Sequence, residues 1–68
     1  MPIIQVNLLA GRTMEMKQRL MKALTESAVA TLGVPSETVR VIVTEILPEH
    51  WATGGVPKAP ATDGEAGS

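Results

Sequence analysis

The sequence predicts an α/β protein: a single βαβ unit with parallel strands, followed by a short C-terminal hairpin or edge strand and assembled into an oligomer. Two apolar, β-branched stretches flank a segment of helical periodicity, and such a connection joins parallel strands by a right-handed crossover in about 98% of cases. The chain has 68 residues and no cysteine, so its own core is marginal and no disulfide reinforces it. The strand–helix–strand order therefore predicts the fold, and the small size of the chain predicts that several copies associate.

The stretch IIQVNLL, residues 3–9, predicts the first strand. Apolar Ile4, Val6 and Leu8 alternate with polar amides, the period of two that is typical of a strand with one buried face. Gly11, in the AGRT that follows, interrupts the regular backbone. The strand therefore ends at a short turn.

Residues 14–32 predict a helix. Apolar side chains return at every fourth position from Leu20 to Leu32, which places them on one helix face. Thr13 is a suitable N-cap, and Gly33 suits the left-handed residue that follows a helix. Both ends of the helix are therefore marked in the sequence.

The stretch VRVIVTEIL, residues 39–47, predicts a second strand because β-branched residues dominate its centre. Pro48 ends this strand. Parallel strands tend to be covered on both faces, and a single helix covers only one. We expect the other face to meet another copy of the chain, through some of Ile3, Gln5, Asn7, Val41 and Val43.

Small residues and proline dominate the C-terminal end of the chain. Gly54 and Gly55 suit a tight turn, and the segment around Val56 suits an edge strand added to a neighbouring copy. We therefore expect a domain over residues 1–56 and a flexible tail over residues 57–68.

Composition excludes several classes of function. The net charge is −1 and the basic residues are scattered, so no patch suits nucleic acid or an anionic membrane. No apolar run approaches the roughly 20 residues of a membrane span, and no basic segment begins a signal peptide, so we expect a cytoplasmic protein. One histidine, no cysteine and no glycine-rich phosphate loop lead us to expect no metal and no cofactor.

Pro2 is the residue with unusual chemistry. Once Met1 is removed, it carries a secondary amine at the head of a strand. Terminal amines titrate near pH 8, and burial or nearby cations lower their pKa toward neutrality, where an amine can act as a general base. The structural alternative is that Pro2 only begins an edge strand, where its missing N–H costs nothing.

Arg12 and Arg40 occupy places where an arginine needs an explanation. Arg12 follows the first strand, and Arg40 lies within an apolar one. Each guanidinium either pairs with a carboxylate, from Glu37, Glu45 or Glu49, or leaves its planar fork free to bind the carboxylate of a ligand. Together with a terminal amine, the two arginines suit a carboxylated, enolisable substrate.

Trp51 is the only aromatic residue in the chain. An indole in this place suits a core filler or an interface anchor, and its position before a glycine-rich segment also suits the apolar wall of a pocket. The neighbouring His50 better suits a surface or hydrogen-bonding role.

These residues together resemble the tautomerase superfamily, and within it the short 4-oxalocrotonate tautomerase group. The resemblance rests on the MPI start, on LLAGRT at the end of the first strand, on VRVIVTE in the second, and on HWATGG after it. It covers about residues 2–55 without an evident gap.

The resemblance implies a cofactor-independent isomerase that catalyses 1,3- or 1,5-proton transfer on small carboxylated dienols such as 2-hydroxymuconate. It implies that Pro2 is the general base, that Arg12 holds the distal carboxylate, and that Arg40, from a neighbouring subunit, stabilises the 2-oxygen. Trp51 replaces the usual phenylalanine of the pocket wall, and Leu9 is expected to contact substrate as well.

The family's usual assembly implies a homohexamer, a trimer of dimers, although some members are heterohexamers of two related chains. The alternative function is therefore a non-catalytic or partner-dependent subunit of a heterohexamer. A mere self-assembling module leaves the combination of Pro2, Arg12 and Arg40 unexplained. Relatives that hydrate their substrates use, by resemblance, an extra arginine and a water-activating acid. The first strand here contains no arginine, and Ala52 and Thr53 follow Trp51, so the sequence favours tautomerisation.

Overall fold

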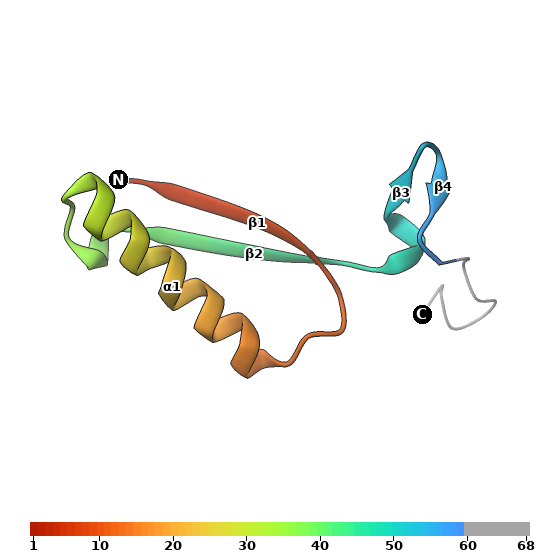
Figure 1. Cartoon of the computed structure of the whole chain (residues 1–68), viewed down its shortest axis with the longest axis horizontal. Coiled ribbons are helices and arrows are strands. Elements are labelled where there is room, and N and C mark those ends of the chain that lie inside the picture. The colour runs from red at the N-terminus through yellow and green to blue at the C-terminus, as the bar shows by residue number, and fades with distance from the viewer. Residues whose placement is uncertain (60–68) are drawn as a thin grey trace.

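The structure is a computed structural model that describes residues 1–59, and it confirms the predicted order of elements (Figure 1). Strands β1 (Ile3–Leu9) and β2 (Arg40–Ile46) pair in parallel, and helix α1 (Met14–Leu32) joins them. The shorter elements are the 3-10 helices η1 (Ser36–Thr38) and η2 (Pro48–His50) and the strands β3 (Ala52–Thr53) and β4 (Val56–Pro57). The fold is α/β, with one βαβ unit and a C-terminal hairpin.

Helix α1 begins and ends where the sequence predicts. The hydroxyl of Thr13 accepts a hydrogen bond from the backbone N–H of Met16 at 3.1 Å. Gly33 follows the helix in the left-handed conformation, with φ +69°, and its N–H donates to the carbonyl of Val29 at 2.9 Å. The N-cap hydroxyl and the C-terminal glycine thus satisfy backbone groups that each helix end leaves unpaired.

The packed face of α1 rotates along the helix. Leu20, Leu24 and Ala28 are half-buried as predicted, but Leu32 is 59% exposed. Because four residues advance an α-helix by about 400°, a row of every fourth residue drifts by about 40° per step. Leu32 has therefore turned away from the sheet, and Val29 is half-buried in the last turns instead.

The register between the strands decides which side chains α1 covers. Ile4 lies opposite Val41 and Val6 lies opposite Val43, and all four are half-buried on the side of the sheet that faces α1. Of the residues proposed for the other face, Ile3, Gln5 and Asn7 therefore lie there, whereas Val41 and Val43 do not. Their parity along β2 is set by pairing with β1, since successive side chains of a strand point to opposite faces.

The face that α1 leaves uncovered carries apolar side chains that no part of the described chain shields. Ile3 is 59% exposed and Ile42 is 48% exposed. No side chain within residues 1–59 is buried, and the radius of gyration of 15.6 Å exceeds the value of about 11 Å that is typical of a compact chain of this length. The described chain therefore has no core of its own. The exposed members of this face are Ile3, Gln5, Asn7, Arg40, Ile42 and Thr44.

Strands β3 and β4 form a hairpin that projects from the βαβ unit (Figure 1). Thr53 lies opposite Val56, so Gly54 and Gly55 make the whole turn, with φ +62° and +83°. Two positive φ angles are what a two-residue hairpin of this kind requires, and glycine adopts them without strain. The predicted tight turn is therefore confirmed.

The predicted C-terminal tail begins inside this hairpin, because β4 includes Pro57. Lys58 and Ala59 then donate backbone hydrogen bonds to carbonyls that precede β3. Residues 60–68 lie outside the described residues, so the flexibility predicted for residues 57–68 stays a prediction.

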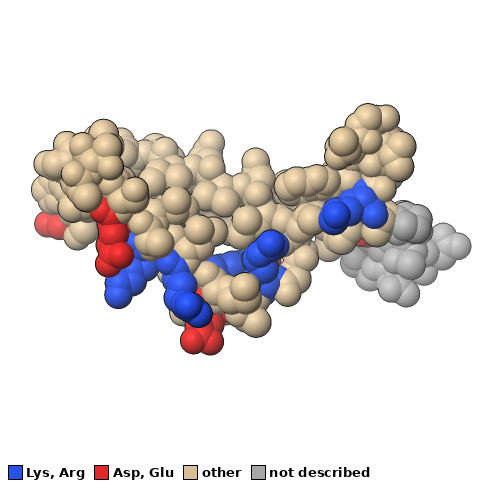
Figure 2. All heavy atoms as spheres, viewed as in Figure 1, with Lys and Arg blue, Asp and Glu red and all other residues tan. Residues whose placement is uncertain are grey.

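Charged side chains of both signs intermix along α1 on the face shown in Figure 2. Within residues 1–59 one ion pair forms, between Lys17 Nζ on α1 and Glu45 Oε2 on β2 at 2.8 Å. It borders a groove of about 310 Å³ between helix and strand, whose other lining residues are Met14, Met21 and Val43. None of the helices in this part of the chain has the length and apolar character needed to cross a membrane.

Candidate active site

Pro2 lies at the start of β1, where its backbone is tied to the second strand. Its carbonyl accepts a hydrogen bond from the N–H of Arg40 at 3.0 Å, and Pro2 is half-buried. Met1, directly ahead of it, is 79% exposed. The sheet therefore holds Pro2 in place, while Met1 remains accessible.

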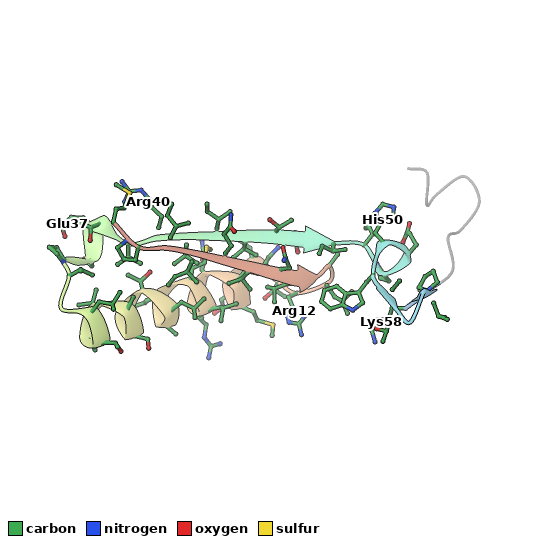
Figure 3. All side chains as sticks on the ribbon, turned by 90° about the horizontal axis from the view of Figure 1, so that it is seen from above. Arg12, Glu37, Arg40, His50 and Lys58 are labelled. Carbon is green, nitrogen blue, oxygen red and sulfur yellow. The ribbon has the colours of Figure 1, made fainter. Side chains whose placement is uncertain are left out.

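Arg40 begins β2, at the same end of the sheet, and its side chain extends away from α1 (Figure 3). Its Nη1 donates to the carbonyl of Glu37 at 2.8 Å, which uses only part of a guanidinium group with five N–H donors. No carboxylate pairs with Arg40 among the described residues, whose one ion pair is Lys17–Glu45. The remaining donors of Arg40 are thus available to a ligand.

Arg12 lies beyond the opposite end of β1. It is exposed, and its Nη1 lies 3.5 Å from the carbonyl of Leu9, which is long for a hydrogen bond. The seven residues of β1 separate Arg12 from Pro2, a span of roughly 23 Å at the usual rise of a strand. A single chain therefore does not bring Arg12 next to Pro2.

Leu9 and Trp51 lie at the Arg12 end of the molecule. Leu9 is the last residue of β1, and Trp51 directly follows η2. The N–H of Trp51 donates to the carbonyl of Pro48 at 3.2 Å, and both Leu9 and Trp51 are half-buried. His50, by contrast, is exposed. This end of the chain thus combines an exposed guanidinium with aliphatic and aromatic surface.

The candidate residues form two groups at opposite ends of one chain, as the labels of Arg40 and Arg12 in Figure 3 show. Pro2 and Arg40 lie at one end, where a backbone hydrogen bond joins them, and Leu9, Arg12 and Trp51 lie at the other. In residues 1–59 no cluster of acidic and histidine side chains is suited to a metal ion. Within residues 1–59 of one chain the two groups do not come together.

A small βαβ subunit with a proline at the head of its first strand is characteristic of one class of enzyme, the tautomerases. The family model described as "Tautomerase enzyme" matches residues 2–60. The chain belongs to the tautomerase family, and its homologues identify it as an isomerase of the 4-oxalocrotonate tautomerase type.

Two sequence relatives define this similarity further. The chain is 56% identical over 63 residues to a probable tautomerase of Ralstonia nicotianae, a match that covers 93% of this chain and 90% of the relative. It is 40% identical over 57 residues to the 2-hydroxymuconate tautomerase of Pseudomonas sp. strain CF600, with coverage of 84% and 90%.

Solved structures of 4-oxalocrotonate tautomerases have the same fold as this chain. TomN, a 4-oxalocrotonate tautomerase homologue in the tomaymycin biosynthetic pathway, aligns with a TM-score of 0.82 and 49% identity, covering 84% of this chain and 88% of TomN. The heterohexameric 4-oxalocrotonate tautomerase of Chloroflexus aurantiacus aligns with a TM-score of 0.81 and 38% identity, covering 85% of this chain and 94% of that one.

Proposed function

We propose that this chain is a cofactor-independent tautomerase that acts on small carboxylated dienols such as 2-hydroxymuconate, with Pro2 as the general base. The observation that carries the proposal is the 3.0 Å hydrogen bond from the N–H of Arg40 to the carbonyl of Pro2, because it fixes the head of the strand instead of letting it fray. The 40% identity to a 2-hydroxymuconate tautomerase supports this class of substrate.

The chemistry depends on the removal of Met1. While Met1 remains, the nitrogen of Pro2 belongs to a resonance-stabilised amide and is not a base. The free amine takes the proton of the 2-hydroxyl and returns it to C3 or C5, which converts the dienol into a 2-oxo acid with no net gain or loss of atoms. Negative charge develops on the 2-oxygen during the transfer, and in this proposal the guanidinium of Arg40 from a neighbouring subunit stabilises it.

A second copy of the chain supplies the other half of the site in this proposal. Two copies that run in opposite directions bring the Arg12 end of one beside the Pro2 end of the other. The uncovered face with Ile3 and Ile42 supplies apolar surface for association, and burial of such surface stabilises assemblies by about 25 cal/mol per Å². We propose a homohexamer, a trimer of dimers, as the assembled form.

Turnover of 2-hydroxymuconate by the purified chain tests the proposed function. We expect ketonisation with a kcat/KM in the ordinary enzyme range of about 10⁴–10⁸ M⁻¹s⁻¹. The loss of the ultraviolet absorbance of the dienol measures the rate. The buffer alone sets the background rate. If neither mono- nor dicarboxylated dienols are converted faster than this background, the proposed function is refuted.

Replacement of Arg40 by alanine is expected to lower kcat by about 10²-fold and to change KM less, because the loss of one donor to a developing oxyanion has an effect of that size. Steady-state kinetics with 2-hydroxymuconate measure both constants. Arg19→Ala, which removes an exposed arginine from α1, is the matched control. A rise in KM without a fall in kcat would assign Arg40 to binding alone.

Replacement of Arg12 by alanine is expected to raise KM for 2-hydroxymuconate by about tenfold, since a charge-assisted hydrogen bond contributes about 1.5 kcal/mol. Phenylenolpyruvate has no distal carboxylate, so its KM should change less than about twofold. Comparison of the two substrates in the variant measures this difference. Equal increases would show that Arg12 does not contact the distal carboxylate.

The second candidate function is a non-catalytic or partner-dependent subunit of a heterohexamer, which the similarity to the Chloroflexus aurantiacus protein favours. Native mass spectrometry separates the two. An active assembly of this chain alone, with Met1 absent, supports the first function. An inactive chain that gains turnover only with a distinct related chain supports the second.

A further inference from the structure

The hairpin places Lys58 directly opposite Trp51. Thr53 pairs with Val56, and the same register continued toward the hairpin base pairs Trp51 with Lys58. The N–H of Lys58 donates to the carbonyl of Trp51 at 2.6 Å. Residues that face each other in antiparallel strands project their side chains to the same side, with Cβ atoms about 5 Å apart. The ammonium group of Lys58 therefore shares a face of the hairpin with the indole.

The backbone of Lys58 is held in this position from both sides. Pro57 before it belongs to β4, and the N–H of Ala59 after it lies 3.4 Å from the carbonyl of Pro48 in η2. The side chain itself is exposed. Within residues 1–59 the single ion pair is formed by other residues, so no described carboxylate neutralises Lys58.

Lys58 and Arg12 lie toward the same end of the molecule (Figure 3). Arg12 follows the C-terminal end of β1, and Lys58 belongs to the hairpin that follows the C-terminal end of β2. Because β1 and β2 are parallel, these ends meet at one edge of the sheet. The end that holds Trp51 thus carries two exposed cations, on separate segments of the chain.

We propose that Lys58 determines specificity in the tautomerase site: its ammonium, with Arg12, attracts the distal carboxylate of a dicarboxylated dienol and favours it over monocarboxylated substrates. The inference rests on the proposed function, because it assigns the Trp51 end to the far end of the substrate. Lys58 is a positioning residue here and takes no part in the proton transfer. An ammonium adds attraction without the fixed geometry of a guanidinium.

Replacement of Lys58 by glutamine is expected to raise KM for 2-hydroxymuconate by about threefold, the size of effect that one solvent-exposed ion pair has. The kcat for this substrate and both constants for phenylenolpyruvate stay unchanged. Lys58→Arg keeps the charge and restores the KM. Lys22→Gln removes an exposed lysine from α1 and is the matched control, with no effect on either substrate.

Fluorescence gives a second measurement that needs no turnover, because Trp51 is the only tryptophan of the chain. Titration with adipate, an unreactive dicarboxylate, and with hexanoate, its monocarboxylated counterpart, follows binding through the indole emission. We expect Lys58→Gln to weaken adipate binding by about threefold and to leave hexanoate binding unchanged.

The outcomes separate the inference from the proposed function. An unchanged adipate affinity and an unchanged KM ratio in Lys58→Gln, with normal turnover by the wild type, would overturn the role of Lys58 alone. A wild type without turnover whose adipate affinity still depends on Lys58 would overturn the proposed function and retain the anion site.

Discussion

Replacement of Pro2 by alanine is expected to lower kcat for 2-hydroxymuconate by two to four orders of magnitude, because general-base catalysis contributes roughly 10²–10⁴-fold. The ring of proline restricts rotation about its N–Cα bond and thereby the direction of the nitrogen lone pair. Alanine supplies a freely rotating primary amine in its place. Stopped-flow or steady-state absorbance measurements on the trimmed protein, with its mass verified, determine the loss.

The backbone contact of Pro2 survives this substitution, since the carbonyl that accepts from Arg40 is present in alanine as well. The assembly and its unfolding transition should therefore match those of the wild type. Pro35→Ala, at an exposed proline before η1, serves as the control and should retain full turnover. Normal turnover by a chain that keeps an untrimmed residue ahead of Pro2 would exclude the amine as the base. Normal turnover by Pro2→Ala would show that the proline ring is not required.

Replacement of Ile42 by glutamate is expected to dissociate the assembly and abolish turnover at micromolar concentrations. Ile42 is 48% exposed at the middle of the uncovered face, opposite Gln5. Burial of a carboxylate there against a second copy would raise the free energy of association by several kcal/mol. The association constant would therefore fall more than about 100-fold. Sedimentation velocity and native mass spectrometry report the change in mass.

Two companion variants keep this prediction testable. Ile42→Val removes one methylene, so it should retain the assembly with a loss of about 1 kcal/mol in stability. Gln18→Glu adds the same charge at an exposed position of α1 and should leave the mass unchanged. An Ile42→Glu protein that keeps the wild-type mass would show that this face is not the surface of association.

Local signals explain why the elements could be predicted from the sequence. Alternation along residues 3–9, the hydroxyl of Thr13 and the conformation of Gly33 each act within a few neighbours, and each is found as expected. The faces of β2 could not be predicted in the same way. Its β-branched residues occupy both parities of VRVIVTEIL, so only the pairing with β1 shows that Val41 and Val43 face the helix.

The candidate site residues could be selected from the sequence, but their arrangement could not. Pro2, Arg12 and Arg40 stand out because their chemistry is unusual where they occur, yet β1 separates Pro2 from Arg12 by its whole length. Sequence reasoning missed Lys58, which was assigned to the tail. The Gly54–Gly55 turn contains the needed signal, since a two-residue turn fixes the cross-strand partners on both sides.

In the proposed assembly, the absence of any buried side chain in residues 1–59 makes folding and association one equilibrium. Protein concentration then acts as a stabilising agent, because each subunit is a ligand for the native form of the next. Dilution destabilises the native form, and the midpoint of thermal unfolding should rise with protein concentration. A cell that lowers expression of this chain would lose activity more steeply than it loses protein.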